Sequence, residues 1–127
     1  MLIAQVSDLH VSPEKDHLHL FEQALSWLAH VNPDVLVLSG DLTDNHWLEG
    51  YQLIATRLRQ QNYPSFILPG NSDNRRLMQS VWDKHSWAQD APDDALHFTY
   101  DAGDLRLTGL DSTVEAQEYG SVTEHLE

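Results

Sequence analysis

Three short apolar runs alternate with two longer amphipathic segments over the first seventy residues. The runs at residues 2–7, 34–40 and 65–70 are rich in Leu, Ile and Val, a composition typical of buried strands. The segments at residues 17–31 and 47–61 carry apolar residues at helical spacing. The order strand, helix, strand, helix, strand predicts an α/β fold built on a parallel βαβαβ unit.

Each expected helix has one apolar face, which should pack on the sheet. In the first helix Asp16 is placed to act as N-cap, and the face consists of Leu18, Phe21, Leu25 and Leu28. In the second helix the face consists of Leu48, Tyr51, Ile54, Ala55 and Leu58. Asn-Pro at 32–33 and Pro64 mark the ends of the two helices.

The pattern changes after residue 74. Residues 75–85 predict a short helix, and residues 96–112 predict a β-hairpin with a tight turn at Asp101–Asp104. Ser121 and Glu124 have the spacing of a capping box, which predicts a helix start at residues 121–127. With no linker or low-complexity tract, residues 1–127 are expected to form a single domain.

The net charge of the chain limits the kinds of molecule that it is expected to bind. Seven Lys and Arg stand against twenty Asp and Glu, which leaves a formal net charge of −13. So acidic a surface repels phosphate backbones and anionic lipid, so we expect no nucleic-acid partner and no membrane partner. The chain has no Cys, which excludes a thiolate metal site. The first ten residues lack the pattern of a signal peptide, and a cytoplasmic location is the expectation.

Polar side chains follow all three predicted parallel strands. Asp8 and His10 come after the first strand, Asp41 after the second and Asn71 after the third. The carboxyl ends of parallel strands meet at one edge of the sheet, where open α/β sheets hold ligands. Oxygen and imidazole donors without sulfur suit Mn, Fe, Zn or Mg. Taken singly, each residue has a plainer alternative as a loop or turn residue, such as an Asx turn at Asn71.

The motifs that contain these residues have a wider resemblance. Asp-Leu-His at 8–10, Gly-Asp-Leu-Thr-Asp at 40–44 and Gly-Asn-Ser-Asp at 70–73 resemble the first three signatures of the calcineurin-like metallophosphoesterases. Leu-Asp-Ser at 110–112 resembles the branch with bacterial cyclic-nucleotide phosphodiesterases, for which 3',5'-cyclic AMP is the expected substrate. The similarity extends over essentially the whole chain.

This resemblance implies roles for the four candidate ligands. Asp8 and His10 would bind one divalent metal, Asp41 would bridge to a second, and Asn71 would bind the second metal and the substrate. The bridge must be anionic, because it offsets the repulsion between two close cations. The implied fold is the N-terminal half of a four-layer α/β/β/α sandwich. The chain is therefore expected to be a truncated form whose second sheet face is left uncovered.

Two departures from the family pattern bear on activity. Ser72 replaces a family His that binds phosphate and protonates the leaving group, and a hydroxyl does this poorly near neutral pH. The later Gly-His motifs of the family are also absent, since none of the remaining candidates, His85, His97 and His125, follows a Gly. We expect His85 to end a helix and His97 to lie on a strand face.

Two hypotheses about function follow. The first is a metal-dependent hydrolase of small phosphodiesters with a dinuclear centre, impaired by Ser72. The second is a non-catalytic scaffold that holds one metal or none and associates through its uncovered sheet face, for example as a homodimer.

Overall fold

Strands and helices alternate along the chain as the apolar pattern predicts. The computed structural model describes residues 1–83, 86–88 and 95–113. In this part of the chain β1 (Ile3–Val6), β2 (Val35–Ser39) and β3 (Ser65–Leu68) form a parallel sheet in the order β1-β2-β3. The first helix, α1 (His17–Val31), follows β1, and α2 (Leu48–Arg59) follows β2. The structure confirms the predicted α/β fold built on a parallel βαβαβ unit.

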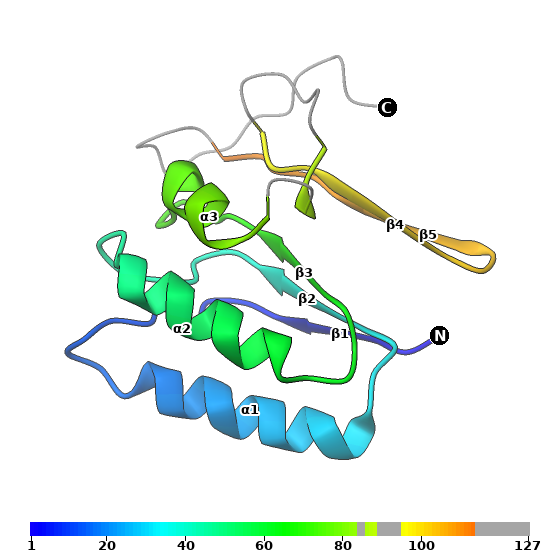
Figure 1. Cartoon of the computed structure of the whole chain (residues 1–127), viewed down its shortest axis with the longest axis horizontal. Helices are drawn as coiled ribbons and strands as arrows, with labels where there is room; N and C mark the ends of the chain where they lie inside the picture. The colour runs from blue at the N-terminus through cyan, green and yellow to red at the C-terminus, as the bar shows by residue number, and fades with distance from the viewer. Residues whose placement is uncertain (84–85, 89–94, 114–127) are drawn as a thin grey trace.

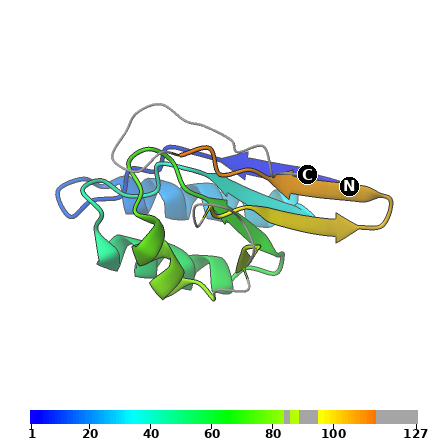
Figure 2. The same cartoon turned by 90° about the horizontal axis from the view of Figure 1, so that it is seen from above.

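The two helices cover one side of the sheet, as Figure 1 and Figure 2 show. The register pairs Val6 with Leu38 and Leu38 with Ile67, so these side chains share one face. The core on this face includes three fully buried or nearly buried side chains from α1 and four from α2: Phe21, Leu25, Leu28, Tyr51, Ile54, Ala55 and Leu58. Both predicted helix faces are thus confirmed in the main.

One detail of the helix predictions is wrong, and one is confirmed in position only. Leu48 is 39% exposed, because α2 begins there and a side chain in the first turn points past the end of the packed face. Asp16 occupies the N-cap position of α1, but its side chain makes no capping hydrogen bond. Its backbone carbonyl accepts instead, from the N–H of Leu20 at 3.3 Å.

A hairpin covers part of the other face of the sheet. The strands β4 (Phe98–Ala102) and β5 (Leu105–Gly109) pair antiparallel, and their two-residue turn contains Gly103 at φ +60°. Phe66 of β3 stacks on Phe98 with ring centroids 5.0 Å apart, and its ring is tilted against that of Tyr100 with centroids 4.7 Å apart. This two-stranded sheet matches the predicted hairpin, and it lies against β3.

The same face is open at β1. Ile3 is 38% exposed, and the neighbouring outward side chain, Gln5, is also exposed. Within the described residues, this face is thus exposed at β1, whereas the hairpin covers it at β3.

The third helix is shorter than its predicted range. It is α3 (Arg75–Val81), and the side chain of Asn74 caps it by accepting from the N–H of Leu77 at 3.1 Å. The predicted helix start at 121–127, with its capping box, lies outside the described residues, as do His85 and His125. None of the described helices is long and apolar enough to cross a bilayer.

Candidate metal centre

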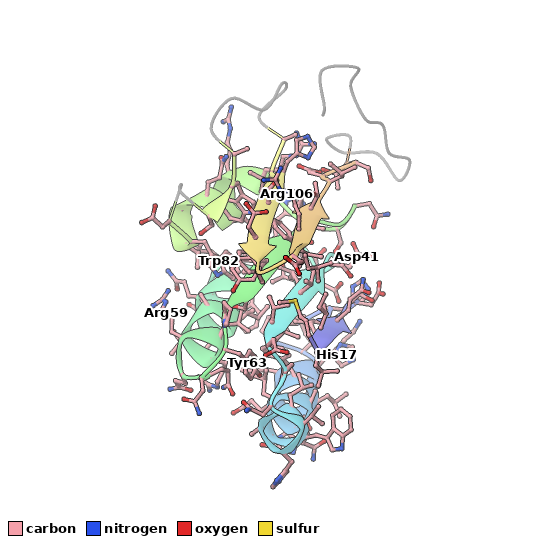
Figure 3. The ribbon with its side chains drawn as sticks, turned by 90° about the vertical axis from the view of Figure 1, so that its right-hand side faces the viewer. His17, Asp41, Arg59, Tyr63, Trp82 and Arg106 are labelled. Atoms are coloured by element: carbon pink, nitrogen blue, oxygen red, sulfur yellow. The ribbon has the colours of Figure 1, made fainter. Side chains whose placement is uncertain are left out.

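The loops that follow β1 and β2 run side by side beyond the sheet. The N–H of Asp8 donates to the carbonyl of Gly40 at 3.0 Å, and the N–H of His10 donates to the carbonyl of Asp41 at 2.9 Å. These bonds continue the parallel pairing past the strand ends. As predicted, the carboxyl edge of the sheet brings together Asp8, His10 and Asp41. Figure 3 labels Asp41.

Three candidate ligand atoms lie close enough together to share one metal ion. One donor atom each from Asp8, His10 and Asp41 lies within 4.8 Å of the other two. The Nε2 of His10 is 3.6 Å from Oδ1 of Asp8. Two carboxylates and an imidazole are the donors that a hard or borderline divalent cation prefers. The donor set therefore fits a divalent metal.

A third carboxylate, that of Asp44, orients the imidazole of His10. Nδ1 of His10 is 2.8 Å from Oδ1 of Asp44, and the other oxygen of Asp44 is 3.2 Å from Nζ of Lys15. A hydrogen bond from Nδ1–H to Asp44 leaves the Nε2 lone pair free toward Asp8, which is the arrangement of a metal-binding His. Burial raises the pKa of Asp44, but the hydrogen bonds from His10 and Lys15 outweigh it, and the pKa lies below its usual value.

The backbone of all three candidate ligands is strained. Asp8, His10 and Asp41 have φ of +59°, +47° and +52°, a region that residues other than Gly rarely adopt. Each such residue costs on the order of 1–3 kcal/mol and persists only where its surroundings impose it. The rest of the fold thus holds these three side chains together against a local preference.

Two glycines allow the loops after β2 and β3 to approach each other. Gly40 has φ +104°, and a Cβ there would lie 2.9 Å from the Cα of Gly70. A Cβ on Gly70 would in turn overlap the backbone nitrogen and carboxylate of Asp41. Only residues without a side chain fit at both positions, and the close approach places Asp41 beneath the turn at residues 70–73.

Ser72 supports Asp41 directly. Its backbone N–H donates to Oδ1 of Asp41 at 3.0 Å, and its hydroxyl lies 3.1 Å from the same oxygen and 3.0 Å from the carbonyl of Thr43. A single hydroxyl proton serves one of these acceptors at a time. The geometry therefore gives Ser72 a positioning role toward Asp41, and a catalytic role for Ser72 stays a prediction.

Asn71 lies on the same turn. The turn is closed by the N–H of Asp73, which donates to the carbonyl of Gly70 at 3.1 Å, and Asn71 is exposed at its tip. Its neighbour Ser72 touches Asp41, so Asn71 lies close to the predicted centre. Its roles in metal and substrate binding stay predictions.

The sequence analysis missed Asp73, the residue that connects the two loops. Its carboxylate accepts from the N–H groups of Leu42, Thr43 and Gly70 at 3.0, 3.3 and 2.8 Å, and from the hydroxyl of Tyr51 at 2.8 Å. Burial raises the pKa of Asp73, and these hydrogen bonds only partly offset that. Asp73 thereby holds both segments that flank Asp41. The available signal was a third consecutive polar residue after Gly70, directly following Asn71 and Ser72.

A second buried carboxylate fixes the hairpin. Asp111 is 3% exposed, pairs with Nε of Arg75 at 2.9 Å and accepts from the N–H of Leu96 at 2.8 Å. Its own N–H donates to Nδ1 of His97 at 2.8 Å. His97 lies directly before β4 rather than on a strand face, and burial lowers its pKa. The Leu-Asp-Ser motif therefore connects the hairpin to α3.

The carboxyl edge of this parallel sheet thus brings together carboxylates and an imidazole that could hold a divalent metal. The family model described as calcineurin-like phosphoesterase matches residues 1–121. The chain belongs to the calcineurin-like phosphoesterase family, as its motifs predicted.

Curated relatives are named as phosphodiesterases. The chain is 26% identical to a probable glycerophosphodiester phosphodiesterase of Arcobacter nitrofigilis, over 98% of this chain and 48% of the relative. It is 34% identical to a probable cyclic nucleotide phosphodiesterase of Fibrobacter succinogenes, over 64% of this chain and 34% of the relative. A probable cyclic nucleotide phosphodiesterase of Vesicomyosocius okutanii is 29% identical over 68% of this chain and 40% of the relative. The chain thus spans less than half the length of these relatives.

Proposed function

We propose that this chain carries the N-terminal metal-binding part of a phosphodiesterase that hydrolyses small phosphodiesters. The observation that supports this most directly is the convergence of Asp8, His10 and Asp41 within 4.8 Å at the carboxyl edge of the sheet. Family membership adds the expectation of divalent metals, with Mn, Fe, Zn and Mg all compatible with these donors.

Each residue has a part in the proposed reaction. Asp8 and His10 would hold one metal, and Asp41 would be shared with a second. Asn71 would hold that second metal and contact the phosphoryl group. When bound, such a metal pair supplies Lewis acidity to the phosphoryl oxygen and lowers the pKa of the attacking water. Asp41 can bridge because it carries a negative charge and because Ser72 fixes the orientation of its carboxylate.

Ser72 should determine which leaving groups the proposed enzyme can release. A serine hydroxyl does not protonate a departing alkoxide readily, and loss of a general acid typically slows a reaction by ~10²–10⁴-fold. Diesters with acidic leaving groups, which need little protonation, should therefore be the best substrates of this chain. Cyclic nucleotides, named for several relatives, release a sugar alkoxide, so the replacement of the family His by Ser72 should slow their hydrolysis more.

The test is hydrolysis of bis(p-nitrophenyl) phosphate with added Mn²⁺. Its leaving group needs little protonation, so the assay does not penalise Ser72. We expect activity that Asp41→Asn abolishes, since an amide cannot replace the anionic bridge. Equal rates for the wild type and Asp41→Asn would overturn the proposed function.

A non-catalytic scaffold is the second candidate, and the exposed edge of the sheet favours it. Met1, Leu2 and Ile3 are 61%, 47% and 38% exposed beside β1. An apolar edge of this kind promotes association, including a homodimer. Under this alternative the protein is a dimer by light scattering and Ile3→Lys makes it a monomer. A monomer at all concentrations would reject the alternative.

A further inference from the structure

The loop between β1 and α1 carries two of the three candidate ligands in a strained backbone. Residues 7–16 separate the end of β1 from the start of α1. Asp8 and His10 lie in this loop with φ of +59° and +47°. Residues other than Gly disfavour this region, so contacts from elsewhere in the fold must stabilise the loop in its observed conformation.

The N–H groups of the loop are held by the neighbouring loop after β2. The N–H of His10 donates to the carbonyl of Asp41 at 2.9 Å, and the N–H of Val11 donates to the carbonyl of Leu42 at 2.9 Å. These bonds fix one side of the loop. They do not engage the carbonyls of Leu9 and His10, which are left to accept from another group.

His17, the first residue of α1, supplies the donor for both carbonyls (Figure 3). Its Nδ1 lies 3.1 Å from the carbonyl oxygen of Leu9 and 3.0 Å from that of His10. A carbonyl oxygen can only accept, so Nδ1 carries the proton and shares it between the two oxygens. The ring of His17 is half-buried, so water competes less for this hydrogen bond.

The positive φ of His10 allows one donor to reach both carbonyls. Successive carbonyls point to opposite sides in an extended chain, whereas in a helical backbone they point the same way. The left-handed backbone at His10 therefore turns its own carbonyl and that of Leu9 toward one side, where His17 meets them. The hydrogen bond from His17 thus favours the conformation that the loop adopts at a candidate ligand.

The helix that carries His17 is anchored in the core. Phe21, one turn further along α1, is 2% exposed and packs in the core together with Leu25. The packing of α1 on the sheet therefore sets the position of the imidazole of His17. Through this side chain the core fixes the loop that carries Asp8 and His10.

We propose that His17 is a positioning residue of the metal centre. By holding the carbonyls of Leu9 and His10, its Nδ1–H keeps the loop in the conformation that aims Asp8 and His10 at Asp41. His17 acts through the loop and needs no contact with the metal or the substrate. The inference rests on the proposed function, because it takes Asp8, His10 and Asp41 as metal ligands.

Three substitutions at His17 separate the hydrogen-bond donor from the shape of the side chain. His17→Phe keeps a ring and removes the donor. His17→Asn places an amide N–H where Nδ1 lies, and His17→Gln places it one bond further out. His19→Phe is the matched control, because it makes the first of these changes at an exposed position of the same helix.

The first measurement is isothermal titration of Mn²⁺ into each metal-free variant, under conditions in which urea unfolding shows the variant to be folded. We expect His17→Phe to weaken Mn²⁺ binding about 10-fold, the lower end of the usual effect of removing a group that supports a metal ligand. His17→Asn should bind Mn²⁺ nearly as tightly as the wild type and more tightly than His17→Gln. His19→Phe should match the wild type.

A role confined to the stability of α1 gives a different result. His17→Phe would then lower the urea midpoint and leave the Mn²⁺ affinity of the folded protein unchanged, and the inference would be overturned. If His17→Phe does not fold, the order of His17→Asn and His17→Gln decides, and equal or reversed affinities reject the inference.

The second measurement is amide hydrogen exchange of the metal-free protein, which does not depend on metal binding. The amides of His10 and Val11 should lose protection in His17→Phe and keep it in His17→Asn, while the amide of Leu38 in β2 stays protected in both. Unchanged protection of the loop amides in His17→Phe would contradict the inference.

The inference and the proposed function fail in different ways. If the wild type shows no saturable Mn²⁺ binding, the proposed function is refuted and the inference with it. If the wild type and His17→Phe bind Mn²⁺ equally well, the inference alone is refuted.

Discussion

The hydroxyl of Tyr51 should contribute strongly to the stability of the candidate site. Tyr51 is fully buried, and its hydroxyl donates to Oδ1 of Asp73 at 2.8 Å and accepts from the N–H of Asn74 at 3.0 Å. Tyr51→Phe removes a hydrogen bond to a carboxylate, worth about 1.5–3 kcal/mol, and takes its acceptor from the part-buried N–H of Asn74, which adds a smaller loss. Because neighbouring effects are not additive, we expect a total loss of about 2–4 kcal/mol.

The measurement is urea and thermal unfolding beside a matched variant. For a chain of this length the loss corresponds to a fall in Tm of about 8–15 °C. Tyr63→Phe is the control, because Tyr63 (Figure 3) is 8% exposed and its hydroxyl has no hydrogen-bond partner within the described residues. Removal of that hydroxyl should leave stability unchanged or raise it. A loss below about 0.5 kcal/mol in Tyr51→Phe, or equal losses in both variants, would refute this reasoning.

Three further predictions concern the loops and the hairpin. Gly70→Ala should destabilise the fold by about 1–3 kcal/mol in urea unfolding, because the added Cβ would overlap Asp41. The same overlap should weaken Mn²⁺ binding. Wild-type values in both assays would contradict this prediction. Asp44→Asn should weaken Mn²⁺ affinity by about 10–100-fold in a calorimetric titration, since the amide no longer fixes His10 with a charged acceptor; the same loss in Asp83→Asn would show that the effect is not local. Stability should fall as pH drops below 6.5, because the buried His97 has a folded pKa under the unfolded value of 6.5, so the unfolded state takes up the proton first. Unfolding at pH 7.5 and 5.5 should show a smaller pH effect in His97→Asn, whose oxygen can still accept from Asp111; an equal effect would exclude His97 as the cause.

The local pattern of apolar and polar residues was sufficient to predict the helices and strands. The helix faces that bury Phe21 and Ile54 follow from spacing alone, and the hairpin follows from two apolar runs about a Gly-containing turn. The errors lie at helix ends. Leu48 has the spacing of a buried residue, yet it begins α2 and so lies outside the packed turns. Boundaries depend on cap geometry and tertiary contacts that spacing does not contain.

Only part of the candidate site could be predicted from the sequence. Asp8, His10 and Asp41 were expected together because parallel strands share one carboxyl edge. The role of Asp73 was not, because its partners come from three segments that meet only in the folded chain, represented by Leu42, Gly70 and Tyr51. The support from Asp44 was missed likewise, since 34 residues separate it from His10.

The central claim is that Asp8, His10 and Asp41 form a divalent metal site, and direct Mn²⁺ binding tests it. Isothermal titration of the metal-free protein should be run with the wild type, Asp41→Asn and Asp104→Asn, the last at an exposed hairpin turn that removes the same charge. The account predicts saturable binding that Asp41→Asn weakens at least 10-fold, a loss of about 1.4 kcal/mol, and that Asp104→Asn leaves intact. Equal weakening by both variants, or no saturable binding in the wild type, would contradict it.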